Sequence, residues 1–554
     1  MDFILDRAAT AHDKLIYTED WRAWRDPEIP DLIDPIAVLI EKHLGTPIEN
    51  KPAIIADGVA TSYGELAKLV RVVSAGLNAI DVSAENRVLL FGTDSLDYLL
   101  MWFGALRVGA IPAVVSDLYK SRELLYFLND TNVRFLFIDS EQLPKLLEIA
   151  SGLPHALRCI VVRGAIPPGL EAQLPGRKIV SFESIRTSQA KAVPAHARHS
   201  NDVAYMFYSG GTTGTAKGIT HLAYDFMLVP QRQGHFWEYR SSDIVFATSR
   251  KYFTHGLWPG ALIPLYWGAT AVLDRRPPGP EPVLETLEKY AVTKWITVPT
   301  ILKNVVEHLR VGGERVNLPK LGLVTSASEK ISPELFEQFF TLFGIELFDS
   351  IGSSEITYEW IANRPKEFRR GSLGKPVFGY EIRLVDADGR DVTEPDVPGE
   401  AWVRSRTACF YYWRKYDKSR ETFVGPWART GDNLTFDRDG FFWFSGRGND
   451  VFKVKGLWVS PLEIEAALTN HPAVREAAVI SYEDADGLTR PKAYVVLREG
   501  FSPDDKLIAQ LNEAVKPIGG YKVPGAYKFI GELPRTTLLK IDRRALREAS
   551  VPRK

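Results

Sequence analysis

The stretch "RVLLFGTDSLDYLLMWFGALRVGAIPAVV", residues 87–115, indicates how this chain folds. Its first residues, 87–92, form a short apolar run that is typical of a buried strand, and 111–115 form a second such run. Between them, 95–109 carries apolar residues at helical spacing and ends at a glycine, a residue that commonly stops a helix. A strand, a helix and another strand in this order predict α/β layers with largely parallel strands.

The same alternation extends over the N-terminal half of the chain. Upstream, 34–45 is predicted to be a helix that Asp34 caps, with Pro35 in its first turn. Further strand-like runs lie at 134–139, 158–164, 203–208, 293–299 and 321–327. The predicted fold class is therefore α/β.

Near residue 380 the pattern changes. "EIRLVDADGRDV" (381–392) and "GEAWVRS" (399–405) are typical of strands with an Asp-Gly turn, which predicts a β-rich subdomain. After "GRGND" (446–450), predicted helices at 461–471 and 505–516 surround predicted strands at 474–482 and 491–499. We therefore predict a large N-terminal domain, 1–447, of layered α/β subdomains plus the β-rich subdomain, and a small α+β C-terminal domain, 448–554.

The composition is that of an ordinary globular protein of 554 residues, with 45% hydrophobic and 25% charged residues. The formal net charge is −1 and no long basic run appears, which argues against nucleic acid as a partner. Only two cysteines, Cys159 and Cys409, are present, which argues against a disulfide scaffold and fits a reducing cytoplasm. The first residues lack a secretory signal layout, and no window of about 18 apolar residues predicts a membrane span.

The segment "YSGGTTGTAKG" (208–218) is rich in glycine and hydroxyl side chains and ends near a lysine. It is not a Walker loop, because Ala216 and Gly218 stand where that motif requires glycine and Ser or Thr. Glycines let the backbone turn its N–H groups inward, while hydroxyls and a lysine add further donors, so the segment predicts an anion site at the end of strand 203–208. A flexible surface loop is the alternative reading.

This segment resembles the signature of the adenylate-forming (AMP-binding) superfamily, [YF]-[ST]-[SG]-G-[ST]-T-G-x-[PA]-K-G. Members join a carboxylic acid to AMP, expel pyrophosphate and mostly pass the acyl group to coenzyme A or a carrier thiol. Gly210 and Ala216 depart from the usual Ser and Pro. The resemblance covers about residues 30–550, and its other segments are "SASEKISPEL" (326–335), "DSIGSSE" (349–355), "RTGD" (429–432), "FSGRGNDVFKVKGLWVSPLEIE" (444–465) and "LPRTTLLKIDRRALR" (533–547).

The resemblance implies roles for individual residues in the ATP site. Glu355 would hold Mg²⁺ against the triphosphate, and Asp432 would accept the ribose hydroxyls with Arg447 beside it. Lys540 would be the catalytic lysine that contacts the acyl carboxylate and the phosphate, although Leu539 replaces the usual glycine before it. The other ATP- or AMP-binding residues implied are Ser209, Gly210, Gly211, Thr212, Thr213, Gly214, Lys217, Ser326, Ala327, Ser328, Glu329, Asp349, Ser350, Ile351, Gly352, Ser353 and Ser354.

The family lets a thiol reach the acyl-AMP by rotating the C-terminal domain, so the resemblance implies that this small domain is mobile. The hinge position is Asn449, where Asp or Lys is commoner. The face that the rotation brings in would form the coenzyme A tunnel from Lys455, Gly456, Leu457 and Trp458.

Within the family the chain most resembles the benzoate-CoA ligase branch. The acyl pocket would follow from "RKYFTHGLWPG" (250–260), with Phe253, Thr254, His255 and also Gly352 as its candidate residues. The branch tends to have a small residue and then tyrosine at 254 and 255, so this chain adds polarity there. That indicates an acid with a hydroxyl, amino or ring-nitrogen group. The buried-type aromatics Tyr205 and Trp258 could be core or pocket, and His221 and Tyr224 could border the pocket.

The predicted function is that of an AMP-forming acid–CoA ligase that activates benzoate or a substituted aromatic acid. Its cofactors and substrates would be ATP, Mg²⁺ and coenzyme A, and the protein would be a cytoplasmic monomer or homodimer. Three alternatives stay open: a ligase for alicyclic or short aliphatic acids, an enzyme that loads a carrier protein, and a nucleotide-binding protein without turnover. Leu539 and Asn449 would favour the last of these.

Overall fold

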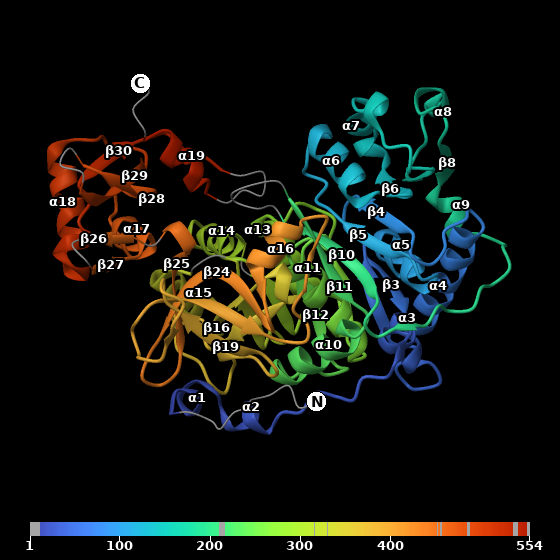
Figure 1. Ribbon diagram of the computed structural model, residues 1–554, viewed down its shortest axis with the longest axis horizontal. Coiled ribbons are helices and arrows are strands. Elements are labelled where there is room, and N and C mark those ends of the chain that lie inside the picture. Colours follow the sequence, from blue (N-terminus) through green and yellow to red (C-terminus); the bar gives the residue numbers. More distant parts are fainter. Residues whose placement is uncertain are drawn as a thin grey trace.

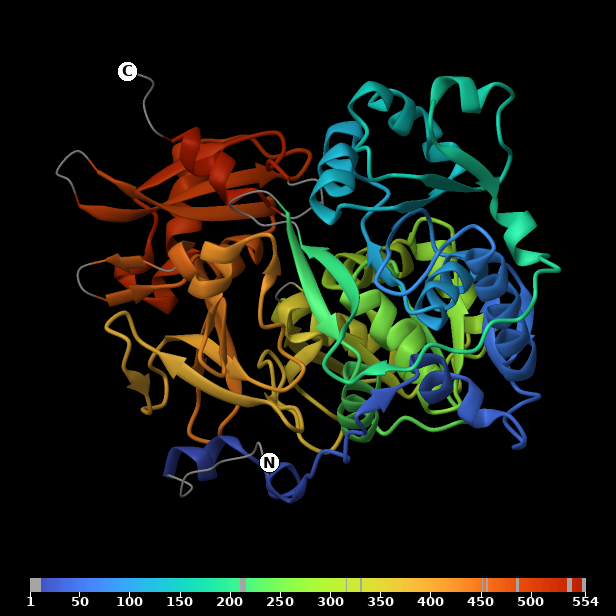
Figure 2. The ribbon, with the colours of Figure 1, turned by 45° about the vertical axis from the view of Figure 1, so that its right-hand side comes forward.

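The computed structural model describes residues 11–209, 216–314, 316–328, 331–450, 452–454, 457–484, 488–535 and 541–550. Two large sheets with their helices make up most of the molecule, and a β-rich sheet lies between them and a small C-terminal unit (Figure 1). Figure 2 shows the C-terminal unit, in red, next to the orange β-rich part, with the cyan part of the first large sheet at the other side. The α/β prediction with a large and a small domain is confirmed.

The first large sheet is built on a parallel core. Its order is β22-β11-β10-β5-β4-β6-β7-β8, and the strands from β10 to β8 are parallel, whereas β11 and β22 add antiparallel edges. The strands are β4 (Arg87–Phe91), β5 (Ile111–Val114), β6 (Phe135–Asp139), β7 (Cys159–Arg163), β8 (Lys178–Ser181), β10 (Val203–Ser209), β11 (Lys217–Leu222) and β22 (Tyr412–Trp413).

The stretch 87–115 forms the predicted strand–helix–strand unit. α5 (Leu96–Arg107) begins where the Ser95 side chain accepts a hydrogen bond from the Tyr98 amide, and Gly109 after it has a φ of +83°. The predicted helix at 34–45 is shorter than expected. Asp34 caps α3 (Pro35–Leu39), but Ile40 has a φ of −124°, and a 3₁₀ turn, η1 (Glu41–His43), replaces the rest of the helix.

The second large sheet also has a parallel centre with antiparallel edges. Its order is β18-β17-β16-β15-β14-β12-β13-β2-β3, and the strands from β2 to β16 are parallel. Its strands are β2 (Pro52–Ala56), β3 (Val59–Ser62), β12 (Ile244–Ala247), β13 (Thr270–Leu273), β14 (Lys294–Thr297), β15 (Leu323–Ser326), β16 (Leu347–Gly352), β17 (Glu359–Ala362) and β18 (Lys375–Pro376).

Helices cover both sheets, and one apolar core that includes Leu66, Trp102, Tyr205 and Trp258 joins them. The helices of this part are α1 (Ala11–Ile16), α2 (Glu19–Ala23), α4 (Tyr63–Asn78), α6 (Ser121–Thr131), α7 (Leu143–Leu147), α8 (Leu170–Gln173), α9 (Phe182–Arg186), α10 (Asp225–Phe236), α11 (Thr254–Leu257), α12 (Ile263–Tyr266), α13 (Pro280–Lys289), α14 (Pro299–Arg310) and α15 (Pro333–Phe343). None of the helices within the described ranges combines the length and apolarity needed to cross a membrane.

The β-rich subdomain is a six-stranded antiparallel sheet. The predicted Asp-Gly turn joins β19 to β20, and Gly389 has a φ of +81° there. The elements are β19 (Glu381–Val385), β20 (Asp391–Val392), β21 (Gly399–Arg404), α16 (Tyr416–Thr422), β23 (Phe423–Val424), β24 (Trp427–Phe436) and β25 (Phe442–Arg447). The N-terminal helices α1 and α2 run along this part (Figure 1), where the Trp21 indole donates to the Val377 carbonyl at 3.0 Å.

The small C-terminal domain has apolar clusters of its own. One contains Val459, Ile464 and Leu511, and another contains Tyr494 and Leu546. A domain that buries its own core can move as a unit. Its elements are β26 (Phe452–Val454), β27 (Leu457–Val459), α17 (Pro461–Thr469), β28 (Val474–Glu483), β29 (Thr489–Leu497), α18 (Asp505–Val515), β30 (Ala526–Phe529) and α19 (Arg543–Glu548).

Candidate active site

The glycine-threonine loop joins the ends of a β-hairpin. Ser209 at the end of β10 and Lys217 at the start of β11 are register partners. The loop therefore follows the carboxyl end of a parallel strand, as predicted, but it leads into an antiparallel strand instead of a helix. The predicted phosphate-binding residues Gly210, Gly211, Thr212, Thr213 and Gly214 lie outside the described residues.

Lys217 and Glu355 meet beside this hairpin. The Lys217 ammonium lies 3.9 Å from Oε1 of Glu355 and 4.6 Å from the centroid of the Tyr412 ring. Tyr412 donates its hydroxyl hydrogen to the same Oε1 at 2.9 Å. Desolvation lowers the pKa of Lys217 and Glu355 opposes this change, while burial and then Glu355 raise the pKa of Tyr412. Lys217 and Glu355 were predicted from the sequence, whereas Tyr412 was not.

The donor set at Glu355 fits Mg²⁺ only together with substrate oxygens. Among the described residues there is no group of three or more His, Cys, Asp or Glu that could hold a metal ion. Mg²⁺ is commonly held by one or two carboxylates plus phosphate oxygens and water, so one carboxylate next to the predicted phosphate-binding loop is adequate. The Glu355 side chain is 19% exposed, which leaves it open to a ligand.

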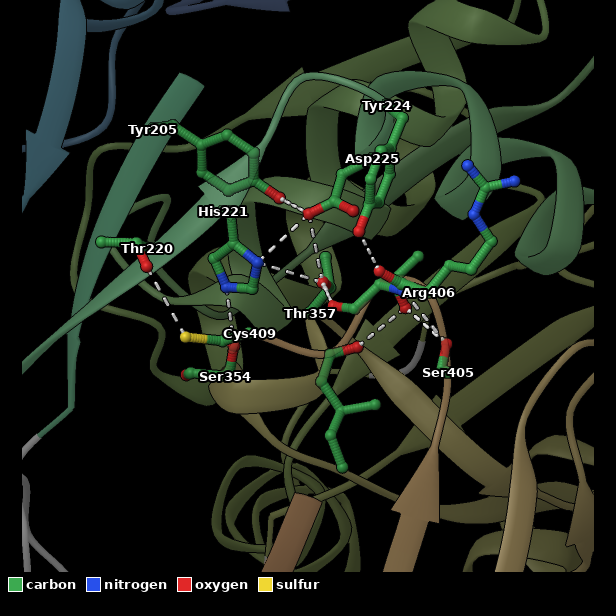
Figure 3. A network of polar contacts seen from close by, with 12 residues as sticks. Tyr205, Thr220, His221, Tyr224, Asp225, Ser354, Thr357, Ser405, Arg406 and Cys409 are labelled. Atoms are coloured by element: carbon green, nitrogen blue, oxygen red, sulfur yellow. Dashed lines mark hydrogen bonds and ion pairs between the residues drawn. The ribbon is translucent and has the colours of Figure 1, made fainter. Parts of the chain in front are cut away.

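A buried polar network supports the segment that carries Glu355 (Figure 3). His221, on β11, contacts the Ser354 carbonyl through Nε2 at 2.8 Å and Oδ2 of Asp225 through Nδ1 at 3.1 Å. Tyr205 donates to Asp225 at 2.9 Å, and its ring stacks on the imidazole at a centroid distance of 4.9 Å. A carbonyl only accepts, so His221 must donate from Nε2. This network positions the residue that precedes Glu355.

Thr357 is the strained member of the network. Its φ is +80°, which is an outlier for a β-branched residue. Its hydroxyl donates to the Thr407 carbonyl at 2.7 Å. The same hydroxyl lies 3.3 Å from Nδ1 of His221 (Figure 3). Backbone strain of this kind persists where surrounding contacts hold it, often at functional sites. Here it turns the chain from Glu355 into β17.

The two predicted ribose-binding residues lie side by side. Asp432 on β24 and Arg447 on β25 are register partners, and Nε of Arg447 donates to Oδ1 of Asp432 at 2.8 Å. The Asp432 side chain is 1% exposed and that of Arg447 is 53% exposed. Asp432 raises the pKa of Arg447 by its charge. Arg447 is therefore the open member of the pair and Asp432 the buried one.

The residues predicted to border the nucleotide lie at the carboxyl ends of neighbouring parallel strands. Ser326 of β15 and Asp349 of β16 are register partners, and Ser350 lies 3.1 Å from the Ser326 carbonyl. Parallel α/β sheets bind ligands at this edge. Ser328, where the family commonly has glycine, has a φ of +81°, which explains that preference. Of the remaining predicted residues, Glu329 lies outside the described residues, while Ala327, Ile351, Gly352 and Ser353 lie along the same two segments.

The predicted acyl-pocket residues adjoin the Glu355 segment. Thr254 Oγ1 lies 3.3 Å from Ser354 Oγ, and His255 Nδ1 lies 3.0 Å from Ser249 Oγ. A buried ion pair fixes the loop that leads to them, because the Lys251 ammonium lies 3.4 Å from Asp94. Phe253 is partly buried against the main core.

Three further pocket candidates have structural roles. Tyr205 and Trp258 are fully buried in the core, with ring centroids 6.0 Å apart. Tyr224 is buried as well, and its hydroxyl donates to the Arg406 carbonyl (Figure 3).

Several predicted C-terminal residues lie beyond what the structure describes. The catalytic-lysine candidate Lys540 and the tunnel candidates Lys455 and Gly456 lie outside the described residues. Leu457 is 51% exposed at the start of β27, in which Trp458 pairs with Lys453. Asn449 lies in the 3₁₀ turn η6 (Gly448–Asp450) that follows β25. Their roles stay predictions.

The comparisons with known proteins define the class. The model of the AMP-binding enzyme family matches residues 41–413, and the model of the AMP-binding enzyme C-terminal domain matches 463–540. The chain therefore belongs to the AMP-binding enzyme family, and the resemblance drawn from its sequence is confirmed.

Its relatives within the family are ligases. It is 35% identical to the 4-hydroxybenzoate–CoA/benzoate–CoA ligase of Rhodopseudomonas palustris over 92% of this chain and 93% of that protein. It is 32% identical to the benzoate–CoA ligase of Thauera aromatica over 94% and 97%, respectively. A crystal structure of the anthranilate CoA ligase AuaEII with anthranoyl-AMP superposes with a TM-score of 0.84 at 34% identity, covering 94% of this chain and 98% of that one.

Proposed function

We propose that this protein is an AMP-forming acid–CoA ligase whose acid is benzoate or a substituted aromatic acid. The observation that carries the proposal is the position of Glu355, with Lys217 at 3.9 Å on one side and Ser354 next to it, 3.3 Å from Thr254. A candidate phosphate-binding group and a candidate acid-binding group thus flank one carboxylate. The names of the relatives support the choice of an aromatic acid.

In the first half-reaction, a carboxylate oxygen of the acid forms a bond to the α-phosphorus of ATP. The bond from that phosphorus to the bridging oxygen breaks, and pyrophosphate leaves. Such a displacement asks the protein mainly to align the reactants and to neutralise charge. We assign phosphate binding to the loop 209–217, ribose binding to Asp432 and Arg447, and contact with the reacting carboxylate and phosphate to Lys540. Residues 326–329 and 349–354 would border the rest of AMP.

Glu355 is the residue that would hold Mg²⁺. The ion, when bound, supplies positive charge to the phosphates. The protein's part is to place this carboxylate correctly, and Tyr412, Lys217 and the His221 network serve that purpose.

In the second half-reaction, the thiol of coenzyme A attacks the acyl carbon and AMP leaves. We assign 1–447 and 448–554 as the two domains, Asn449 as the hinge, and Lys455, Gly456, Leu457 and Trp458 as the tunnel. The exposure of Leu457 supports this use of its face. The acyl pocket would be formed by Phe253, Thr254, His255 and Gly352.

The proposal extends to the setting of the protein. It would act in the cytoplasm, as a monomer or homodimer, without a nucleic-acid partner. Two free, buried cysteines, Cys159 and Cys409, and a net charge of −1 support these points.

Pyrophosphate release tests the proposal. Purified protein with ATP and Mg²⁺ is given benzoates, heteroaromatic acids, cyclohexane acids and short fatty acids, each with and without coenzyme A. We expect turnover that requires coenzyme A and favours one ring acid. Preference for a cyclohexane or fatty acid would overturn the aromatic assignment, and turnover only with a carrier protein would overturn the role of coenzyme A. ATP binding without release from any acid would indicate a protein that has lost the chemistry.

A further inference from the structure

Helix α6 contacts both ends of the glycine-threonine loop through residues that lie outside every site predicted from the sequence. The Tyr126 hydroxyl donates to the Ala216 carbonyl at 2.6 Å, and Ala216 directly precedes Lys217 in the chain. Near the end of the same helix, the Asp130 carboxylate accepts a hydrogen bond from the Tyr208 hydroxyl at 2.9 Å. Tyr208 belongs to β10, the strand that leads into the loop. One helix therefore holds the chain on both sides of the loop.

The same end of α6 also holds β22. The Trp413 indole donates to the backbone carbonyl of Asp130 at 2.8 Å. Trp413 follows Tyr412, whose ring centroid lies 4.6 Å from the Lys217 ammonium, and β22 is paired with β11 at this point. Lys217 and Tyr412 are the two residues that contact Glu355. Each of them thus has a chain neighbour that α6 binds.

A charged pair strengthens these contacts. Asp130 is buried, and the Lys415 ammonium lies 3.3 Å from its Oδ1. Desolvation lowers the pKa of Lys415, but hydrogen bonds with Tyr126 and Asp130 raise it overall. Hydrogen bonds that involve a charged group are stronger than those between neutral groups. The two α6 side chains and Lys415 therefore form one connected group beside the loop.

We propose that Tyr126 and Asp130 are positioning residues that hold Lys217 in place for the binding of MgATP. The inference rests on the proposed function and adds to it residues that act through Ala216 and Trp413 and do not themselves contact the nucleotide. Lysine binds phosphate as a point charge at the end of a flexible side chain, so the placement of its backbone limits where the ammonium can lie.

Equilibrium binding of MgATP tests the inference without turnover. Calorimetry gives the Kd of the wild type and of Tyr126→Phe, which keeps the ring and removes only the hydroxyl. We expect the Kd of Tyr126→Phe to rise about three- to tenfold, a change of the size that one hydrogen bond supplies. Tyr63→Phe is the matched control and should bind MgATP as the wild type does, because the Tyr63 hydroxyl also donates to a backbone carbonyl at 2.6 Å, that of Ala269 before β13. Thermal unfolding should show similar losses of Tm in the two variants.

A double-mutant cycle separates positioning from a general structural effect. In a Lys217→Met background the ammonium is absent, so Tyr126→Phe should change the Kd by less than about twofold there. Asp130→Asn, which removes the charge that faces Lys415, should raise the Kd in the wild-type background and likewise have little effect without Lys217. An equal rise of the Kd with and without Lys217, or no rise in the wild-type background, overturns the inference.

The same separation should appear during turnover. Tyr126→Phe should raise the KM for ATP and leave the KM for the acid unchanged, and an equal rise in both would contradict a role at Lys217. If Lys217→Met binds too weakly for calorimetry, this comparison of KM values decides. Failure of every acid to release pyrophosphate, with the difference in Kd intact, would instead overturn the proposed function alone. If Asp130→Asn does not fold, Tyr126→Phe alone decides.

Discussion

Glu355 and Glu359 are four residues apart in the chain, yet their carboxylates lie in opposite environments. Glu355 is 19% exposed and has Lys217 and the Tyr412 hydroxyl as neighbours. Glu359 is 1% exposed, and burial raises its pKa to about 7, although the Ser350 hydroxyl opposes the rise. Burial favours the neutral form of a carboxyl, which is the reason for the raised pKa of Glu359. Glu355 is thus accessible to a ligand, whereas the contacts of Glu359 are buried protein groups.

The backbone between the two explains how they diverge. Thr357, with its φ of +80°, turns the chain so that Glu355 faces the β10–β11 hairpin and Glu359 enters β17. His221 and Thr407 hold the turn from both sides. The contrast between the carboxylates therefore depends on this turn at Thr357. Each prediction below changes the surroundings of one of the two carboxylates.

The largest effect should come from Glu355→Gln. Removal of the charge that faces Lys217 and the metal should lower kcat for pyrophosphate release by about a hundredfold or more. The concentration of Mg²⁺ at half-maximal rate should rise, and a magnesium titration measures this. Glu359→Gln is the matched variant and should leave the dependence on Mg²⁺ close to that of the wild type, because its carboxyl is buried away from Lys217. Equal Mg²⁺ curves for the two variants would contradict the difference in roles.

A smaller loss of activity is expected from His221→Ala. The Ser354 carbonyl loses its donor, so Glu355 is held less precisely and kcat should fall about tenfold. The buried Asp225 would lose its imidazole partner and keep only hydroxyl donors such as Tyr205, so the free energy of unfolding should fall by about 3 kcal/mol. Denaturant unfolding and pyrophosphate release measure the two effects. His221→Gln can still donate to the carbonyl and should recover part of the rate. A full rate in His221→Ala would show that Glu355 needs no such support.

The sequence predicted the residues around Glu355 better than it predicted those around Glu359. Parallel strands, the glycine-threonine loop, Lys217, Glu355 and the Asp432–Arg447 pair carry local patterns. The structure places Lys217 next to Glu355 and Arg447 next to Asp432. The roles of the residues beyond the described ranges, Lys540 above all, stay predictions.

The missed residues have no local pattern. Tyr412 reaches Glu355 from 57 positions further along the chain, and Asp225 pairs with His221 only because a turn joins β11 to α10. Glu359 stands in an otherwise apolar strand, which gives no sign of its contact with Ser350. Contacts that form only through tertiary packing leave no pattern in the spacing of residues along the sequence.

The third prediction concerns pH. A carboxyl whose pKa is about 7 in the folded protein, against about 4.5 in the unfolded chain, binds its proton more tightly when folded. Its contribution to stability is therefore full below pH 4.5 and is lost as the pH rises to 7, by up to about 3 kcal/mol. Between pH 4.5 and 7, the free energy of unfolding of the wild type should fall relative to that of Glu359→Gln. Above pH 7 the two curves of unfolding free energy against pH should run parallel. His255, Ser350, Tyr358 and Tyr239 also face this carboxyl, so the difference between the variants isolates Glu359.

The smallest effect should come from Ser350→Ala. This substitution changes the surroundings of Glu359 and keeps both glutamates. The Ser350 hydroxyl donates to Oε1 of Glu359 at 2.8 Å and stabilises its charged form. Loss of this hydrogen bond costs about 1 kcal/mol and should move the stability transition of Glu359 to higher pH by a fraction of a unit. The same substitution should leave the Mg²⁺ dependence at Glu355 unchanged, because Tyr412 and Lys217 are its neighbours there. A shift in the Mg²⁺ curve of Ser350→Ala would mean that the two carboxylates are coupled through β16.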